Sequence, residues 1–155
     1  MTFQTVLFAA ASLMVLADTV KTEVAKSDKE LLQGAWVLFA GARDGKVLTP
    51  EEFQRNEPEP LIRLVFSGDS CEIEIQMDEE TTKVIKVRFV LEATREPKRI
   101  DFLRKKDEGN PHGIYTVDKD EFRLCYCNRP GERPSGFNTK ADPDVEMLIF
   151  RRQKP

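Results

Sequence analysis

The fold begins at residues 31–39, which read Leu31-Leu32-Gln33-Gly34-Ala35-Trp36-Val37-Leu38-Phe39. This stretch opens a strand-like run and holds the only tryptophan of the chain, shortly after a glycine. A second strand-like run, 148–150, closes the chain and is followed by Arg151 and Arg152. We predict that the two runs are the first and last strands of one barrel and lie side by side. The indole would then fill the barrel floor, with a terminal arginine across its face as a cation–π partner.

The chain between these runs alternates apolar and polar side chains, which is typical of strands with one buried face. Every second residue from Cys71 to Met77, for example, is apolar. The expected strands are 36–40, 61–66, 71–77, 83–92, 100–103, 113–117, 121–127 and 145–151. Nearly all are joined by short polar turns, which require antiparallel neighbours. About eight such strands close a barrel whose interior fits side chains or one small ligand. We therefore predict an all-β, up-and-down antiparallel barrel, with a two-layer β-sandwich as the alternative.

The inward faces of these strands are predicted to carry large apolar side chains. The inward set is Trp36, Leu38, Ile73, Ile75, Ile85, Val87, Phe89, Phe122, Leu124 and Ile149. Outward charges of opposite sign would pair across one hairpin. The expected partners are Glu72 and Glu74 with Lys86 and Arg88. Bulky residues crowd the strand centres, while the longest irregular stretch, 128–144, lies at one mouth. We therefore expect a filled floor near Trp36 and a shallow pocket beneath that stretch.

Two short helical turns are expected outside the strands. Ser27 and Glu30 have the spacing of a capping box, and Gly34 ends that turn just before the first strand. Thr49 followed by Pro50 indicates a second helix start. The first of these turns would cap the bottom of the barrel.

Length and charge are typical of a small globular protein with one domain. The chain has 155 residues and a net charge of −3, with both signs mixed along it. A length of this order allows one domain with a sizeable core. Nucleic-acid binders usually present a basic face, so we expect no nucleic acid as a partner.

The amino-terminal segment differs from the rest of the chain. Residues 1–17 contain no charged side chain, and 6–16 form an apolar run. This run is shorter than the ~20 residues that a helix needs to span a bilayer, and Ala17 supplies a small residue for signal cleavage. We predict a signal peptide at 1–17, a polar spacer at 18–28 and one barrel domain at 29–155. The product would be exported to the periplasm, envelope or exterior, without a membrane span after cleavage. No Lys or Arg precedes the run, so a buried N-terminal helix or an uncleaved anchor is the alternative.

The three cysteines are Cys71, Cys125 and Cys127. On one strand, Cys125 and Cys127 point to the same face, which places them poorly for a mutual disulfide. Either Cys71 bonds to one of them, or all three are free thiols that pack as small apolar groups. We favour the free thiols.

The chain resembles two families. Gly34 before Trp36, the meander of strands and the arginine near the end resemble the lipocalin and fatty-acid-binding superfamily. A closer resemblance is to a family of small secreted domains found mainly in planctomycete bacteria. Its marks are Leu32-Gln33-Gly34 with Trp36, Ile100-Asp101-Phe102, Gly113-Ile114-Tyr115, Asp120 with Phe122 and Leu124-Cys125, Arg133-Pro134 with Phe137, and Arg152. The resemblance covers 29–152 and implies a lipocalin-like barrel. It implies no activity, because the family offers none to carry over. Its structural signature here would be Gly34, Trp36, Asp101, Gly113 and Arg152.

The sequence shows no constellation of catalytic residues. The only histidine, His112, is expected to be a solvated loop side chain. Glu72 and Glu74 belong to an outward strand face, whereas Asp118 and Asp120 bracket a tight turn. The cysteines lack both the pair spacing and the fourth ligand of a zinc site. We therefore predict no enzyme, no catalytic residue, no metal and no cofactor.

The irregular stretch 133–137 is the most informative segment outside the strands. Arg133 and Phe137 would either close the barrel mouth over a ligand or serve structure, with Phe137 on the core and Arg133 paired to an acid such as Asp101. The candidate ligand-binding residues are Tyr115, Tyr126, Arg133 and Phe137. We expect a protein that binds one small apolar or amphipathic ligand. The alternative is a filled barrel that acts as a structural or interaction module with an envelope protein as its partner.

Overall fold

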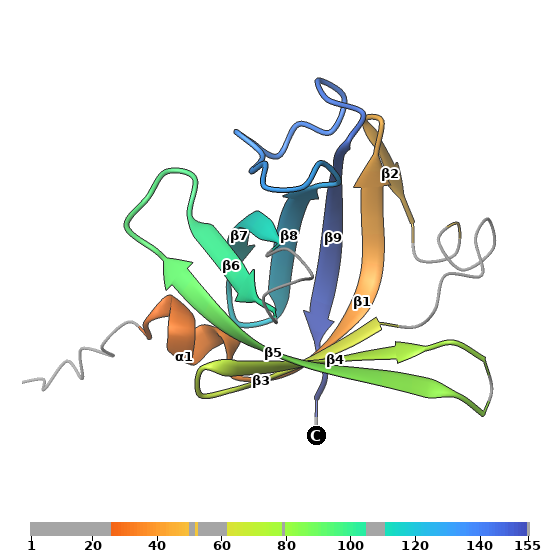
Figure 1. Cartoon of the computed structure of the whole chain (residues 1–155), viewed down its shortest axis with the longest axis vertical. Coiled ribbons are helices and arrows are strands. Elements are labelled where there is room, and N and C mark those ends of the chain that lie inside the picture. Colours follow the sequence, from red (N-terminus) through yellow and green to blue (C-terminus); the bar gives the residue numbers. More distant parts are fainter. Residues whose placement is uncertain (1–25, 50–51, 53–61, 79, 105–110, 155) are drawn as a thin grey trace, which may run out of the picture.

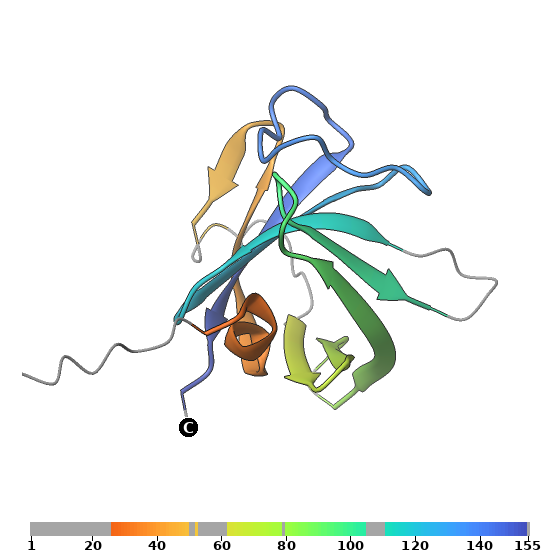
Figure 2. The same ribbon diagram turned by 90° about the vertical axis from the view of Figure 1, so that its left-hand side faces the viewer.

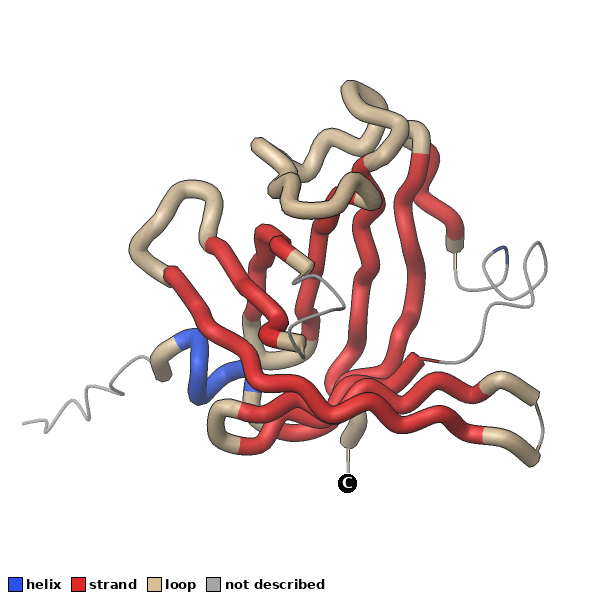
Figure 3. The backbone as a smooth tube through the Cα atoms, in the orientation of Figure 1, coloured by secondary structure: helices blue, strands red, loops and turns tan. Residues whose placement is uncertain are grey.

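The computed structural model describes residues 26–49, 52, 62–78, 80–104 and 111–154. Within these ranges the backbone consists mainly of strands with one short helix (Figure 3). The elements are α1 (Asp28–Leu32), β1 (Gly34–Arg43), β2 (Lys46–Leu48), β3 (Ile62–Ser67), β4 (Ser70–Gln76), β5 (Thr82–Glu92), β6 (Arg99–Leu103), β7 (His112–Val117), β8 (Glu121–Cys127) and β9 (Val145–Arg152). Eight strands, β1 and β3 to β9, close an antiparallel barrel (Figure 1), which confirms the predicted fold class.

The barrel closes where β1 lies between β3 and β9. Trp36 pairs with Leu64 of β3 on one side and with Arg152 of β9 on the other, so the first and last predicted strands do lie side by side. Beyond this point β1 turns back at Asp44 and Gly45, both at positive φ, into the short strand β2. Asp-Gly is a typical dipeptide of such a hairpin turn, but β2 was not among the expected strands.

The helix α1 forms at the predicted capping box and closes one end of the barrel. The Ser27 hydroxyl accepts a hydrogen bond from the Glu30 N–H, and the Glu30 carboxylate accepts one from the Ser27 N–H. Leu32 is buried in the barrel core, and its carbonyl accepts a 2.8 Å hydrogen bond from the Trp36 indole. The loop 128–144 lies at the opposite end of the molecule from α1 (Figures 1 and 2).

The floor of the barrel is filled around Trp36, which is fully buried. The Arg152 guanidinium carbon lies 4.2 Å from the indole centroid, so the predicted cation–π contact is confirmed. Two guanidinium nitrogens also donate to the carbonyl oxygens of Leu31 and Gln33, at the end of α1. Gly34 suits this close approach because its φ is +106° and an added Cβ would lie 3.3 Å from the guanidinium.

A β-bulge in β1 divides its side chains between two apolar cores. The pairing with β9 shifts register between Leu38 and Ala40, so Phe39 is an extra residue in β1. Before the bulge, Trp36 and Leu38 belong to the core inside the barrel. After it, Ala40 and Ala42 belong to a second cluster. A single strand therefore contributes to both cores.

The second cluster, which we call the outer cluster, lies on the outside of the barrel. Its buried members are Ala40, Ala42, Ile114, Cys125, Val145, Met147 and Ile149. Phe137 of the loop 128–144 packs against it. The prediction that Ile149 faces the barrel interior is therefore wrong. Ile149 pairs with Ala40, which follows the bulge, and with Arg123, which is exposed.

The predicted charge pairing across β4 and β5 is half correct. Lys86 Nζ lies 2.8 Å from Glu72 Oε1, as expected. Arg88 does not reach Glu74, because the register places Arg88 opposite Ser70 and Val84 opposite Glu74. Glu74 instead accepts two hydrogen bonds, of 2.8 and 2.9 Å, from Arg63 on β3.

Three predicted segments lie wholly or mostly outside the described residues. They are the signal peptide at 1–17, the polar spacer at 18–28, of which 18–25 are not described, and the second helical turn. In that turn, Thr49 and Glu52 exchange two hydrogen bonds, of 3.0 and 3.2 Å, in the manner of a capping box. In the part of the chain that the structure describes, no helix has both the length and the apolar character needed to cross a membrane.

The three cysteines are free thiols in different surroundings. Cys71 is buried inside the barrel, Cys125 is buried in the outer cluster and Cys127 is partly exposed. Burial raises the pKa of Cys71 to about 12 and that of Cys125 to about 11. Because Cys71 and Cys125 lie on opposite sides of the barrel wall, the structure contains the free thiols rather than the bridge.

We expect Cys127 alone to react with iodoacetamide in the folded protein at pH 8. Cys71 and Cys125 are buried, and their raised pKa values leave almost no reactive thiolate at that pH. Intact-mass analysis should show one added group under native conditions and three in urea. Cys127→Ser should take up none while folded. Fast native labelling of two or three thiols would contradict the packing described above.

Candidate functional site

A cavity of about 470 Å³ opens into the barrel at the end opposite α1. Its inner wall is apolar and is formed by Ile62, Leu64, Ile73, Phe102, Leu124, Leu148 and Phe150. Its rim is polar and includes Arg104, His112, Tyr126, Asn128, Arg129 and Glu132. Small-molecule sites in proteins typically measure about 300–1,000 Å³ and combine an apolar wall with a few polar groups. The cavity therefore has the size and lining of a ligand pocket.

The position of the cavity agrees with the sequence prediction. The floor around Trp36 is filled, whereas the opposite mouth is open beneath the first residues of the loop 128–144. The alternating strands place large side chains at the floor. Ile62 of β3 and Ile73 of β4 line the open part and are only partly buried. We call this cavity the mouth pocket.

Tyr126 and Asn128 are held at the rim of the mouth pocket by Glu146 of β9. The Tyr126 hydroxyl donates a 2.9 Å hydrogen bond to Glu146 Oε2, and the Asn128 amide donates one of 2.8 Å to Oε1. Arg43 lies 2.9 Å from the same carboxylate. Partial burial acts to raise the pKa of Glu146, but the hydrogen bonds from Arg43, Asn128 and Tyr126 outweigh it and hold the pKa below its usual value.

Arg129 closes the loop 128–144 on itself. Its guanidinium donates to Asp142 and Asp144, which lie near the far end of the loop, at 2.5 to 3.1 Å. It also donates to Glu132 at 2.6 Å. These carboxylates raise the pKa of Arg129, with Asp142 contributing most. The guanidinium is thereby engaged by three acids of its own loop.

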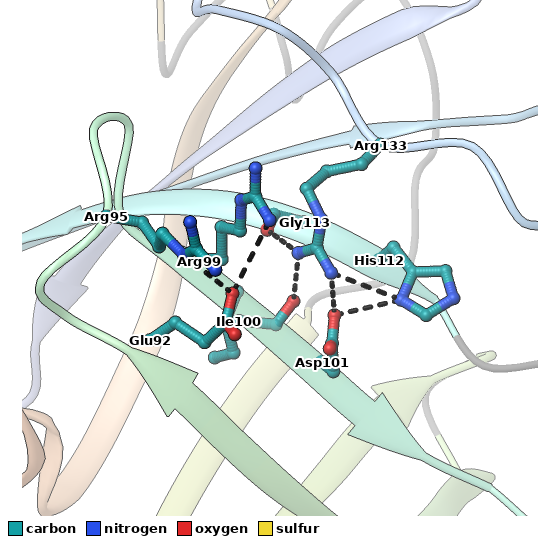
Figure 4. A network of polar contacts seen from close by, with 8 residues as sticks. All are labelled: Glu92, Arg95, Arg99, Ile100, Asp101, His112, Gly113 and Arg133. Atoms are coloured by element: carbon teal, nitrogen blue, oxygen red, sulfur yellow. Dashed lines mark hydrogen bonds and ion pairs between the residues drawn. The ribbon is translucent and has the colours of Figure 1, made fainter.

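Arg133 joins the loop to the barrel wall (Figure 4). One nitrogen donates to the Gly113 carbonyl at 2.6 Å, and another lies 2.5 Å from Asp101 Oδ1. Gly113 is packed too closely for a side chain, because an added Cβ would lie 2.9 Å from a Leu124 methyl carbon. The contact of Arg133 with Asp101 is the structural role that the sequence analysis considered for this arginine.

The four candidate ligand-binding residues do not come together. Tyr126 lines the mouth pocket. Tyr115 is fully buried at the α1 end, where its hydroxyl donates a 2.8 Å hydrogen bond to Asp28. Burial, together with this contact, raises the pKa of Tyr115. Arg133 and Phe137 belong to the part of the loop that covers the outer face, with Phe137 on the outer cluster.

The signature residues fall into two groups. Gly34, Trp36 and Arg152 meet at the floor. Asp101 and Gly113 lie on the paired strands β6 and β7, where both bind Arg133. Each group fixes a segment to the barrel.

Sequence reasoning missed His112 as a rim residue. It was expected to be solvated in a loop, but it is the first residue of β7, pairs with Asp101 of β6 and is 30% exposed at its side chain. His112 Nδ1 lies 2.9 Å from Asp101 Oδ1. Asn128 and Glu132 were missed as well. Their only signal was their place in the long loop, which does not show that they face the pocket.

The described residues contain no group of three or more His, Cys, Asp or Glu side chains arranged to hold a metal ion. A second cavity, of about 300 Å³, lies under the loop beside Arg133 and Cys127 and is lined mainly by loop residues. The chain matches none of the models of known protein families and none of the curated proteins with which it was compared.

Proposed function

We propose that the protein is an exported, non-enzymatic binding protein that holds one small apolar or amphipathic ligand in the mouth pocket. The observation that carries this proposal is the cavity of about 470 Å³, with its apolar wall and polar rim. Export is supported by the uncharged residues 1–17 and the apolar run within them. The absence of a nucleophile–base arrangement in the sequence supports a binding role over catalysis.

The apolar wall supplies enough free energy for useful affinity. Burial of apolar surface contributes about 25 cal/mol per Å², so a ligand that buries ~200 Å² gains about 5 kcal/mol before the costs of association. Rim hydrogen bonds add orientation and selectivity. Ligand contacts would come first from Leu148, Phe150 and Tyr126, which line the pocket on β8 and β9.

Filling the pocket tests the proposal. We expect Leu148→Trp to abolish binding, because residue 148 lines the cavity and an indole would occupy its volume. Native mass spectrometry of the protein purified from its own source should show an added mass that disappears after solvent extraction. That added mass should be lost in Leu148→Trp and kept in Val84→Trp, whose side chain replaces an outward residue that is 58% exposed.

Two results would contradict the proposal. One is an unmodified mass for the wild-type protein together with no binding of added apolar probes. The other is a bound mass that survives in Leu148→Trp, since the ligand would then lie elsewhere. The first result would favour the interaction module with an envelope protein as partner.

A further inference from the structure

The mouth pocket ends at a layer of aromatic rings inside the barrel. Leu124 of β8 and Phe150 of β9 line the pocket, whereas Phe122, the next inward residue of β8 toward the floor, lies behind its wall. Phe122 is fully buried, and its ring stacks on that of Phe150 with the centroids 5.7 Å apart. Phe150 therefore stands between the pocket and the core below it.

Two further rings extend this layer across the barrel. Phe66 of β3 meets Phe122 edge-on with the centroids 5.7 Å apart, and it meets Phe89 of β5 edge-on at 5.1 Å. Phe66 and Phe89 are both buried in the inner core. We call Phe66, Phe89, Phe122 and Phe150 the aromatic plug. Because side chains in protein interiors are close-packed, the plug separates the pocket from the floor around Trp36.

Strand geometry gives the depth of the pocket above the plug. Along β8 and its end, the inward residues that line the pocket run from Leu124 to Asn128. At ~3.3 Å per residue and a strand tilt of ~40°, this span corresponds to about 10 Å along the barrel axis. An extended carbon chain advances ~1.2 Å per bond, as the extended backbone does. A chain of about eight carbons therefore reaches from the rim to the plug.

From this depth we infer that the mouth pocket selects ligands with a medium-length chain of about eight to ten carbons, and that Phe150 sets the limit. The inference deepens the proposed function and rests on it, since it concerns the same pocket. Carbons up to the limit are buried against the apolar wall. Carbons beyond it stay in water at the mouth, because the plug blocks the way inward.

A series of straight-chain alcohols tests the limit on the wild-type protein. The probes are 1-butanol, 1-hexanol, 1-octanol, 1-decanol and 1-dodecanol, titrated by the chemical shifts of the protein in NMR spectra. Each buried methylene should raise the affinity about fourfold up to octanol. Decanol and dodecanol should differ by less than about twofold, whereas two further buried methylenes would give more than about tenfold. Leu148→Trp should abolish binding of the whole series, which assigns the alcohols to the pocket.

Two variants of the plug test the role of Phe150. Phe150→Ala opens the pocket toward Phe122, so dodecanol should bind about tenfold more tightly than decanol. Phe150→Leu removes less volume and is milder for the fold, and its preference for dodecanol should be about threefold. Ile149→Ala is the matched control, because the neighbouring side chain lies in the outer cluster and should leave the limit unchanged. Thermal unfolding shows which variants fold.

The outcomes separate this inference from the function on which it rests. If no alcohol binds the wild-type protein, the binding function itself fails. If the affinity keeps rising about fourfold per methylene through dodecanol, the pocket is a ligand site but the length limit is overturned. A limit that stays the same in folded Phe150→Leu, or that moves equally in Ile149→Ala, would overturn the role of Phe150. The wild-type series and Phe150→Leu decide the matter even if Phe150→Ala does not fold.

Discussion

Replacement of Trp36 by alanine is expected to lower the free energy of unfolding by about 3–5 kcal/mol. The indole is fully buried at the floor, where it contacts Phe122 and lies under the Arg152 guanidinium. Its N–H also donates to the Leu32 carbonyl, which ties α1 to β1. A loss of this size is a large part of the ~5–15 kcal/mol that stabilises a typical domain.

Urea unfolding followed by far-ultraviolet circular dichroism measures the effect of Trp36→Ala without a need for tryptophan fluorescence. Trp36→Phe separates the two contributions, since it keeps most of the apolar volume but loses the donor to Leu32, and it should cost less. Val90→Ala is the matched control, because Val90 is 49% exposed on a barrel strand and should change stability by about 0.5 kcal/mol or less. A loss below about 1 kcal/mol for Trp36→Ala would show that the floor is not the main core.

Arg152→Leu is expected to cost about 2–3 kcal/mol, through the cation–π contact and the hydrogen bonds to carbonyl oxygens. The guanidinium donates to Leu31 and Gln33 on one side and to Lys119 on the other. A leucine can cover the indole face but cannot donate to these carbonyl groups. The carbonyls at the end of α1 would then lose their partner, so the helix should detach more easily from the floor.

The neighbouring arginine provides the control for Arg152→Leu. Arg151 lies over the Phe39 ring at 4.4 Å and 3.6 Å from Glu121, but its side chain is 53% exposed. Exposed ion pairs and cation–π contacts contribute little, so Arg151→Leu should cost about 1 kcal/mol or less. Equal losses for the two variants in chemical denaturation would refute the special role of Arg152.

The barrel was predictable because local signals agree with its long-range pairing. The capping box at Ser27, the Asp44-Gly45 turn and the alternation in β4 each depend on a few adjacent residues. The side-by-side position of β1 and β9 followed from closure, which removes exposed sheet edges. The bulge at Phe39 was not predictable from the sequence. The composition of the strand does not reveal a bulge, although the bulge moves the later side chains of β1 to the opposite face of the sheet.

The site was harder to predict because its contacts join segments that are not adjacent in the sequence. The pairing of His112 with Asp101 depends on the register of β6 and β7, whose connection is too long for a tight hairpin. The contact of Arg133 with Gly113 joins a long loop to a strand far from it in the sequence. The sequence suggested a carboxylate partner for Arg133. It could not indicate the Gly113 carbonyl as a second partner, because every residue has a backbone carbonyl group.

The bulge in β1 also means that damage to the loop 128–144 and damage to the barrel have different consequences. The loop shields an outer sheet face that carries Ile114, Met147 and Ile149. Proteolytic cleavage in this loop would leave the inner core intact, since that core is built on the other face of the same strands. It would uncover an apolar surface, which promotes association between molecules. A clipped chain would therefore remain folded and aggregate before it unfolds.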